Sequence, residues 1–212
     1  MTRSPLLHRI ADYYDGKLAT HGATARGVDW RDERSQELRF ARLLDLVGDD
    51  PSGTIAELGC GYGALAAYLR RTGRANPYHG YDISAEMVRT ARTVQAGLDG
   101  VRFDEGDAPA EADYVVASGI FNVRFDVADD DWRAFVRATI ETMAGRARRG
   151  IAFNVLTAYS DRDRMDPRLY YASPSEMLDW CIGRFGRHVA LRHDYGLYEF
   201  TVLVRTAPEE TP

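Results

Sequence analysis

Cysteine is scarce in this sequence of 212 residues, which contains only Cys60 and Cys181. Two thiols cannot build a disulfide framework or a four-cysteine zinc site, and no other group of metal-binding residues stands out. Disulfide-rich secreted scaffolds and zinc proteins of that kind are therefore excluded. We expect a protein of a reducing compartment, the cytoplasm, without a bound metal.

An excess of positive charge is missing as well. The chain has 27 Lys and Arg residues against 32 Asp and Glu residues, which gives a formal net charge of −5. Proteins that bind DNA, RNA or anionic membranes usually carry an excess of basic residues. No apolar run reaches the roughly 18 residues of a membrane span, and the first residues, MTRSPLLHRI, have no apolar stretch long enough for a signal peptide. We expect no nucleic acid and no membrane among the partners.

Hydrophobic residues make up 45% of the chain, which suits the core of a single α/β domain. Residues 1–50 predict two helices, at 5–18 and 33–48, separated by the loop HGATARGVDW. Asp32 is the predicted N-cap of the second helix, and Gly48 is its stop signal. Residues 51–205 predict the core of the domain. Residues 206–212 predict a tail, which we expect to fray like residues 1–4.

Short apolar runs alternate with helical stretches from Thr54 onward. The predicted strands are TIAEL, YHGY, VRF, ADYVVASG, GIAFNV, HVALRHDY and YEFTVLVR. The predicted helices between them are GALAAYLRRTG, SAEMVRTARTV, DDDWRAFVRATIETMAGRA and SPSEMLDWCIGRFG, with Ser84 and Ser173 as helix starts. This alternation favours a parallel sheet with helices on both faces. The last two strands are too close for a crossover helix, so they form a hairpin and one of them is reversed.

A glycine cluster follows the first predicted strand, in the run Glu57-Leu58-Gly59-Cys60-Gly61-Tyr62-Gly63. Glycine permits a tight turn and removes the Cβ that would keep a ligand away from the backbone. In an open α/β sheet, ligands bind outside the carboxyl ends of the strands, near the first helix. The same run also fits the dinucleotide pattern G-x-G-x-x-A through Gly59, Gly61 and Ala64. The alternative interpretation is a tight turn without a ligand.

Two aspartates follow the next two predicted strands. Asp82 ends the second strand, where its two carboxylate oxygens can accept from both hydroxyls of a ribose. Its alternative role is to cap the helix that begins at Ser84. Asp107 follows the third strand, where a carboxylate can accept from an exocyclic amine of a base. After two strands that suit a nucleoside, this position predicts an adenine site.

Taken together and in this order, these features resemble the class I, Rossmann-like S-adenosylmethionine-dependent methyltransferases. The resemblance covers roughly residues 13–205 and includes the terminal hairpin. It implies a doubly wound, seven-stranded sheet of order 3-2-1-4-5-7-6 with strand seven antiparallel, preceded by N-terminal lid helices. It also implies S-adenosylmethionine as the cofactor and methyl transfer as the reaction.

The resemblance further implies which residues bind the cofactor. Glu57 and the glycine loop would face its amino-acid end, Asp82 its ribose, and Ile83 its adenine ring. Several members of the family grip the cofactor carboxylate with an Arg in the helix before the first strand, which makes Arg39 a candidate; the alternative is a solvated helix charge. The full set of expected cofactor-binding residues is Tyr14, Arg39, Glu57, Gly59, Cys60, Gly61, Asp82, Ile83, Asp107, Ala108 and Gly119.

The acceptor side has weaker signals. Strand four ends in SGIFNV and lacks the Asn/Asp-Pro-Pro-aromatic tetrad of enzymes that methylate exocyclic amines of bases or glutamine side chains. Aromatic and polar residues near the predicted ligand edge suggest contacts with a small-molecule acceptor. We expect them to include Trp30, Asn122, Tyr170, Tyr171 and Tyr195. His21 and His193 are the candidate bases, with a surface or packing role as the alternative for each.

Other functions remain open at this point. A nicotinamide-dependent oxidoreductase has a similar first strand-helix-strand unit. Two helices before the first strand, Glu57 and the terminal hairpin all count against it. A non-catalytic protein that binds S-adenosylmethionine would keep the same acidic residues. The function that the sequence favours is methyl transfer to an oxygen or nitrogen nucleophile of a small molecule by in-line displacement.

Overall fold

The computed structural model describes residues 4–205. The predicted tail, 206–212, and residues 1–3 of the predicted frayed start lie outside this range. The helices of the described part are α1 (Pro5–His21), η1 (Ala25–Val28), α2 (Glu33–Leu44), α3 (Ala64–Arg71), α4 (Ala85–Val94), α5 (Asp129–Ala144), η2 (Arg162–Arg164) and α6 (Pro174–Phe185). The strands are β1 (Ile55–Leu58), β2 (Tyr78–Asp82), β3 (Val101–Glu105), β4 (Ala112–Ala117), β5 (Ala147–Thr157), β6 (Tyr171–Ala172), β7 (Val189–Arg192) and β8 (Glu199–Arg205).

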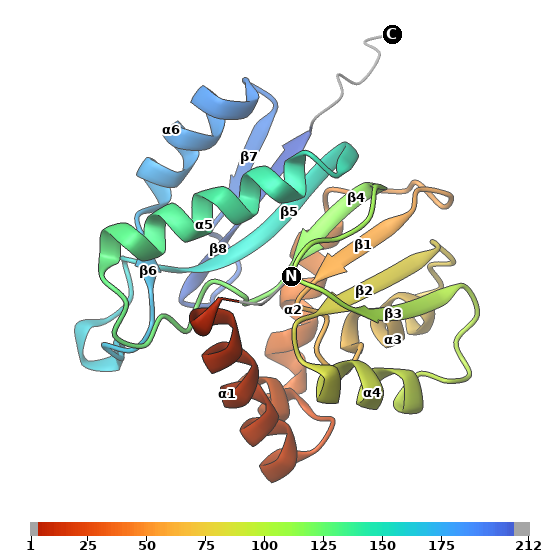
Figure 1. Ribbon diagram of the computed structural model, residues 1–212. Helices are drawn as coiled ribbons and strands as arrows, with labels where there is room; N and C mark the ends of the chain where they lie inside the picture. The colour runs from red at the N-terminus through yellow and green to blue at the C-terminus, as the bar shows by residue number, and fades with distance from the viewer. Residues whose placement is uncertain (1–3, 206–212) are drawn as a thin grey trace, which may run out of the picture.

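One sheet runs through the molecule in the order β3-β2-β1-β4-β5-β8-β7 (Figure 1). The strands from β3 to β5 are parallel, whereas β8 pairs antiparallel with both β5 and β7. With β7 and β8 as strands six and seven, this confirms the expected order and the reversed strand. The register aligns Ile55 with Tyr78 on one side and with Tyr114 on the other. The carboxyl ends of β1, β2 and β4 therefore meet at one edge of the sheet.

The polar caps that the sequence indicates are formed. The side chain of Asp32 accepts a hydrogen bond from the Ser35 N–H at 2.7 Å, and Ser84 accepts from the Met87 N–H at 2.9 Å. Ser173 similarly begins α6. Each cap satisfies a backbone donor that the first turn of a helix leaves without an intrahelical partner. These local contacts explain why the helix starts could be predicted from sequence.

Several elements differ from the sequence prediction: α1 continues to His21 instead of ending near residue 18, and β5 covers Ala147–Thr157 instead of residues 150–155. The expected loop at 21–30 contains the short helix η1, which Thr24 caps through the Gly27 N–H. The second helix ends at Leu44 instead of residue 48, and the chain reaches Gly48 through turns. A short strand, β6, was not predicted because its two residues offer no period to read; it pairs parallel with β5.

Helices cover both faces of the sheet. Residues of α1, α5 and α6 belong to the core on one face and residues of α2, α3 and α4 to the core on the other. In Figure 1, α5 and α6 lie in front of the sheet. Neighbouring residues of β4 point to opposite faces, as expected for a strand. Val115 packs in the core that includes Trp132 of α5, whereas Val116 packs in the core that includes Leu65 of α3. Both strand faces are buried, which explains the continuous apolar run at this position.

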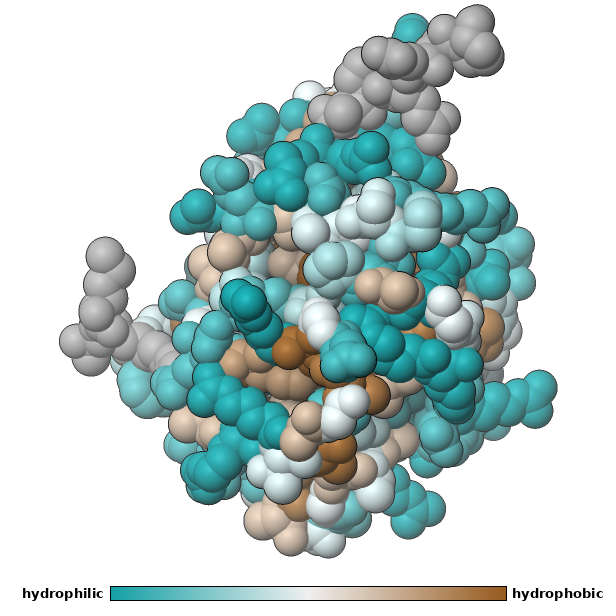
Figure 2. All heavy atoms as spheres, turned by 90° about the vertical axis from the view of Figure 1, so that its right-hand side faces the viewer, coloured by the Kyte–Doolittle hydropathy of each residue, from teal (hydrophilic) through white to brown (hydrophobic). Residues whose placement is uncertain are grey.

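The connection from β3 to β4 contains no helix. Residues 106–111 join these strands directly, and the chain passes in front of the sheet in Figure 1. The side of the molecule formed by the β3 edge is mainly hydrophilic, with an apolar group near its centre (Figure 2). The face of the sheet toward α5 is therefore less completely covered near β3 than near β5.

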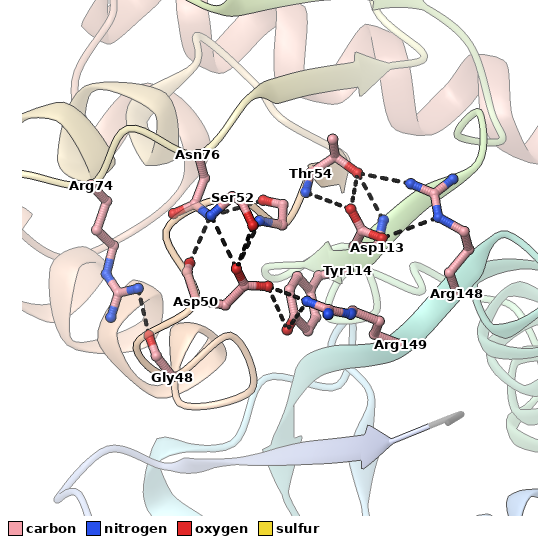
Figure 3. Close-up of polar contacts among 11 residues, drawn as sticks. Gly48, Asp50, Ser52, Thr54, Arg74, Asn76, Asp113, Tyr114, Arg148 and Arg149 are labelled. Atoms are coloured by element: carbon pink, nitrogen blue, oxygen red, sulfur yellow. Dashed lines mark hydrogen bonds and ion pairs between the residues drawn. The ribbon is translucent and has the colours of Figure 1, made fainter. Parts of the chain in front are cut away.

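A polar network ties the opposite edge of the sheet together (Figure 3). Asp113 accepts from the backbone and hydroxyl of Thr54, each at 2.8 Å, and from Arg148 at 3.1 Å. Although burial opposes it, these bonds lower the pKa of Asp113 to about 2. Asp50 similarly accepts from Tyr114 and Arg149. The network connects the starts of β1 and β4. Its charged residues bind one another, so a structural role accounts for them without a ligand.

Candidate functional site

A cavity of about 330 Å³ lies at the carboxyl edge of the sheet. The glycine loop after β1, the end of β2, the loop after β3 and the loop after β4 all contribute to its lining. Segments of α1, α5 and the stretch before α2 complete it. A volume in this range is typical of sites for small molecules. The position matches the edge at which open α/β sheets bind ligands.

The glycine loop follows the floor of this cavity. Gly59, Gly61 and Gly63 all have positive φ angles, of 75°, 53° and 79°, which side chains rarely adopt. A Cβ at Gly59 would lie 2.2 Å from Cγ2 of Ile120, and one at Gly61 would lie 2.9 Å from Cγ1 of Val28. The glycines are therefore required both by the turn and by the close approach of neighbouring segments.

Asp82 fixes the geometry of the loop. Its Oδ2 accepts from the Gly61 N–H and its Oδ1 from the Ser84 N–H, each at 2.8 Å. The carboxylate thus joins the glycine loop to the start of α4 while it lines the cavity. Each carboxylate oxygen can accept more than one hydrogen bond, so capacity for ligand donors remains. The bond to Ser84 agrees with the alternative role at the start of α4, although Ser84 itself is the N-cap, and the ribose contact stays a prediction.

Glu57 adds a second buried carboxyl group. Only 2% of the residue is exposed, and its carboxyl oxygen accepts from the Tyr78 hydroxyl. Burial raises the pKa of Glu57 to about 8, which the Tyr78 hydrogen bond opposes and the nearby Asp82 charge reinforces. Asp107 also lines the cavity, but it is exposed. Asp82 and Asp107 give this end of the cavity the character of a site for a cationic ligand, and Glu57 adds a buried carboxyl group that tends to keep its proton.

The segment between α1 and α2 covers the glycine loop. Val28 and Trp30 both line the cavity, and a Cβ at Gly119 would lie 2.3 Å from Cζ2 of Trp30. The segment is held to α1 because Tyr13 and Lys17 each donate to Asp29 at 2.6 Å. These contacts place the predicted lid directly over the ends of β1 and β4.

Arg39 does not reach the cavity. Its guanidinium donates from Nε to Oε2 of Glu199 and from Nη1 to the Ser35 carbonyl, both at 2.8 Å. It also stacks on Trp30, with Cζ 3.8 Å from the ring centroid. The alternative of a solvated helix charge is wrong, because Arg39 is 7% exposed. In the structure, Arg39 forms a buried ion pair with Glu199 behind the lid. It does not line the cavity, so no contact supports the expected bond to the cofactor carboxylate.

Most of the other predicted cofactor residues come together. Tyr14, Glu57, Gly59, Cys60, Gly61, Asp82, Ile83, Asp107 and Gly119 line the cavity. Ala108 does not line the cavity and lies one residue beyond Asp107, the last lining residue of this loop. Burial raises the pKa of Tyr14 above its usual value, and burial also raises that of Cys60. Both groups are thereby kept uncharged, so Cys60 is unsuited to act as a thiolate nucleophile.

The predicted acceptor residues are more dispersed. Trp30 lines the cavity, but Asn122, Tyr170, Tyr171 and Tyr195 do not. Tyr170 donates its backbone N–H to the Asn122 carbonyl, and the Tyr171 hydroxyl accepts from the Asp166 N–H. The Tyr195 hydroxyl is bonded to Thr201 at 2.9 Å. Tyr170 packs in a hydrophobic core, and Tyr171 and Tyr195 are partly buried outside the cavity lining. Sequence alone cannot separate such packing of a tyrosine from ligand contact.

The two candidate bases also lie outside the cavity. His21 is exposed at the end of α1, and His193 is exposed next to Tyr159. Sequence position near a predicted lid or hairpin was the only reason to select them, and it does not fix the direction of a side chain. The structure brings neither imidazole to the predicted reaction centre.

Sequence reasoning missed much of the apolar lining. The missed residues are Leu7, Ile10, Gln36, Phe40, Met87, Phe135, Ala138, Thr139 and Thr142, together with Val28 and Ile120. On α5 the spacing of positions 135, 138, 139 and 142 marks one helix face, which was a usable signal. It was not distinguishable from an ordinary core stripe, because the sequence does not show which face of a helix borders a cavity.

Comparisons with known proteins agree with this geometry. The methyltransferase domain family matches residues 55–144. A protein of Mycobacterium tuberculosis described as a methyltransferase is 49% identical over 155 residues, which cover 73% of this chain and 93% of that protein. A trans-aconitate 2-methyltransferase of Sinorhizobium medicae is 32% identical over 104 residues, which cover 47% of this chain and 38% of that protein.

Solved structures show the same fold. Magnesium protoporphyrin IX methyltransferase from Synechocystis, with bound S-adenosylmethionine, matches with a TM-score of 0.68 and 16% identity, covering 98% of this chain and 100% of that chain. Human N-acetylserotonin methyltransferase, also with S-adenosylmethionine, matches with a TM-score of 0.64 and 18% identity, covering 98% of this chain and 61% of that chain.

The fold and the site define a class I methyltransferase, and the sequence relatives agree. The chain belongs to the S-adenosylmethionine-dependent methyltransferases and is an enzyme that uses this cofactor. The cavity fits such a cofactor, because backbone glycines leave room at its floor and carboxyl groups complement a cation. The family decides against the nicotinamide-dependent alternative. Among residues 4–205, no helix is long and apolar enough to cross a membrane, and no cluster of three or more His, Cys, Asp or Glu residues could hold a metal.

Proposed function

We propose that the protein methylates an oxygen or nitrogen nucleophile of a small molecule. The observation that carries this proposal is the covered cavity, because Val28 and Trp30 lie over the glycine loop and limit the space beside it. A space of about 330 Å³ under such a lid suits a small molecule better than a folded macromolecule. Magnesium protoporphyrin IX and N-acetylserotonin, named for two proteins with this fold, are also small molecules.

In this proposal, different predicted residues bind different parts of the cofactor. Glu57, Gly59, Cys60 and Gly61 hold its amino-acid end, near Gly119 and Tyr14. Asp82 accepts from the ribose hydroxyls. Ile83, Asp107 and Ala108 surround the adenine. These assignments rest on the shared cavity lining and on the family resemblance, with Ala108 next to that lining.

The chain's own contribution to the reaction is positioning and exclusion of water. When bound, S-adenosylmethionine supplies a methyl carbon on a positively charged sulfur, and the transfer proceeds by in-line displacement. Trp30 and Val28 close the site from solvent, and the walls align the nucleophile. A general base is needed only if the acceptor must lose a proton. The exposed positions of His21 and His193 leave this role unassigned.

The N-terminal segment and the core act as one domain in this proposal. Residues 1–50 supply helices and lid, and residues 51–205 supply the methyltransferase core. Ile10 of α1 packs in one hydrophobic core and Leu43 of α2 in the other, which supports this division of labour. Cys60 and Cys181 are unpaired buried thiols, which supports a reducing, cytoplasmic environment. The net charge of −5 supports an acceptor other than nucleic acid.

Calorimetry tests the cofactor site. S-adenosylmethionine and S-adenosylhomocysteine should bind at micromolar levels, about −8 kcal/mol, with no comparable heat from NADH. Asp82→Asn should weaken binding of S-adenosylhomocysteine at least tenfold, because charge-assisted bonds to two hydroxyls are worth about 1.5–3 kcal/mol each. The matched control is Asp104→Asn on β3, an exposed residue outside the cavity. Unchanged affinity in folded Asp82→Asn protein would move the ribose site elsewhere.

A transfer assay tests the acceptor. The pure protein is incubated with methyl-labelled S-adenosylmethionine and a cell extract of its source, separated into small-molecule and macromolecular fractions. Label should appear in the small-molecule fraction and should be absent when Asp82→Asn protein is used at a low cofactor concentration. Label found solely in RNA or protein would contradict the proposed acceptor class and leave the methyltransferase assignment intact.

A further inference from the structure

One wall of the cavity is apolar and is formed by segments that lie far from the glycine loop in the sequence. Leu7 and Ile10 of α1 contribute to it, together with four residues of α5. Those four residues, Phe135, Ala138, Thr139 and Thr142, have the spacing of one helix face. Apart from Tyr14 of α1, the residues proposed to bind the cofactor lie at the strand ends and in the loops after them, so the wall formed by the other residues of α1 and by α5 is available to the acceptor.

The flank of α5 faces the cavity because of the local topology. Residues 106–111 connect β3 to β4 without a helix, so no helix between these strands covers α5 on that side (Figure 1). Ala138 and Thr142 are accordingly exposed, although they belong to a helix whose opposite side is fully buried through Trp132, Val136 and Ile140. The chain leaves an accessible, small-residue surface in the same cavity as the proposed cofactor site.

The polar groups of this wall are satisfied within α5. The Thr139 hydroxyl donates to the Phe135 carbonyl, and the Thr142 hydroxyl donates to the Ala138 carbonyl, both at 2.9 Å. Their donors are therefore occupied, and the neighbouring side chains present hydrocarbon. An acceptor on this wall would therefore gain most of its binding free energy from burial of apolar surface and little from hydrogen bonds.

Cations that could neutralise an anionic acceptor are engaged elsewhere. Arg9 pairs with Asp126 and stacks on Phe125. Arg133 pairs with Asp130, and Arg137 lies over the Trp180 ring. Within the described part of the chain, no Lys, Arg or His side chain lines the cavity, whereas three carboxyl groups do. Apart from the positively charged sulfur of the cofactor, a carboxylate or phosphate acceptor would meet the carboxylates of Asp82 and Asp107 and no cationic side chain of the lining, which is an unfavourable way to bury an anion.

We infer that the acceptor is an uncharged, largely apolar molecule that binds against the wall formed by α1 and α5. This inference rests on the proposed function, since it assigns the substrate class of the same site. It separates this chain from methyltransferases whose acceptor is an acid or a nucleic acid. The wall selects the acceptor by its lack of charge, and the carboxyl groups at the other end serve the cationic cofactor.

A matched pair of fluorescent probes tests the inference in the full-length protein. N-phenyl-1-naphthylamine is neutral, and 1-anilinonaphthalene-8-sulfonate is the same scaffold with one sulfonate added. With S-adenosylhomocysteine present, the neutral probe should bind at least about tenfold more tightly than the sulfonate. Equal binding, or tighter binding of the sulfonate, would overturn the inference.

Two substitutions locate the probe. Ala138→Arg places a cation on the wall at an exposed helix position, so it should weaken the neutral probe about fivefold or more and reverse the preference toward the sulfonate. The matched control is Ala134→Arg, which is exposed on the same helix but does not line the cavity. Thr142→Arg provides a second exposed wall position in case Ala138→Arg does not fold. Equal effects of the wall and control variants would place the probe outside this wall and overturn the inference.

Two further readouts separate failure of this inference from failure of the proposed function. Binding of S-adenosylhomocysteine without preference for the neutral probe would refute the acceptor class alone. Preference for the neutral probe without binding of S-adenosylhomocysteine would refute the cofactor placement alone. The labelled product of the transfer assay provides a further check: it should extract into ethyl acetate at neutral pH and keep its label in alkali, whereas the ester of an acidic acceptor would release labelled methanol. Retention of that product on an anion-exchange resin would overturn the inference even if methyl transfer occurs.

Discussion

Glu57 shows how one residue at the strand end combines burial with chemistry. It lies beneath the glycine loop, almost without exposure, and its single polar neighbour of note is the Tyr78 hydroxyl. Burial disfavours the charged form of a carboxyl group, and the Asp82 charge disfavours it further. The group therefore keeps its proton in the folded protein at pH values where an exposed carboxyl group has lost it.

The stability of the protein should record this protonation. The pKa of Glu57 rises from 4.5 to about 8 on folding, so the folded state binds the proton more tightly than the unfolded state. The contribution of Glu57 to the free energy of unfolding is then full below pH 4.5 and declines as the pH rises toward 8. We expect Glu57→Gln, which is neutral at every pH, to gain stability relative to the native protein across this window, by roughly 1 kcal/mol or more.

Urea unfolding at pH 5, 6.5 and 8 measures the difference between the two proteins without added cofactor. Glu86→Gln serves as the control, because Glu86 is an exposed residue of α4 that pairs with Arg89 on the surface. A stability difference between Glu57→Gln and native protein that stays constant with pH would show that the carboxyl group is already ionised in the folded state.

At the scale of elements, the segment from η1 to Trp30 connects the N-terminal helices to the site. Thr24 caps η1, and Asp29 binds Tyr13 and Lys17 of α1. Trp30 contributes the other anchor through its stacking on Arg39 of α2. The segment is thus held from both sides while its apolar side chains lie on the glycine loop. A ligand beneath it should add contacts that stabilise this arrangement.

Limited proteolysis with trypsin tests whether the segment responds to the cofactor site. Arg26 and Arg31 are exposed at its two ends. Saturating S-adenosylhomocysteine should slow cleavage after both residues, because ordering of the segment reduces local opening. Cleavage after Arg162 or Arg164, in the exposed helix η2, should continue at its original rate and serves as the internal control. Equal rates at Arg26 with and without the ligand would leave the segment a packing role only.

At the scale of the whole molecule, a contact joins the N-terminal helix α2 to the C-terminal strand β8. Arg39 of α2 and Glu199 of β8 form a buried ion pair at 2.8 Å, and the Tyr195 hydroxyl lies 3.4 Å from the same carboxylate. Burial raises the pKa of Glu199, and the positive charge of Arg39 opposes that rise. Each partner of the pair therefore offsets part of the desolvation of the other.

Removal of one partner should be costly. Arg39→Met leaves a buried carboxyl group without its counter-charge, and we expect it to lower the free energy of unfolding by about 3–5 kcal/mol at neutral pH. Arg71→Met breaks the exposed pair with Glu37 and should cost at most about 1 kcal/mol. Urea unfolding of both variants provides the comparison. Similar, small losses in the two proteins would mean that the buried pair does not hold α2 to β8.

Interactions between residues close in the sequence allowed much of the secondary structure of this protein to be predicted. The caps Asp32, Ser84 and Ser173, the alternation of apolar runs and the glycines after β1 act over a few residues, so the element order, the sheet and the position of the site followed from them. Gly59 and Gly61 were identifiable because the turn itself demands them. Family resemblance then supplied the strand order and the cofactor, which the structure and the relatives confirmed.

Tertiary structure alone decided which long-range partners meet. Nothing near Arg39 in the sequence indicates Glu199, and nothing near Trp30 indicates Gly119, because each pair is joined only when separate elements dock. The same is true of His21 and His193, whose distance from the cavity depends on how α1 and the terminal hairpin pack. The exposed flank of α5 arises because the connection after β3 forms no helix. Capping and periodicity fix an element from within, whereas the surroundings of a side chain depend on elements that lie far away in the chain.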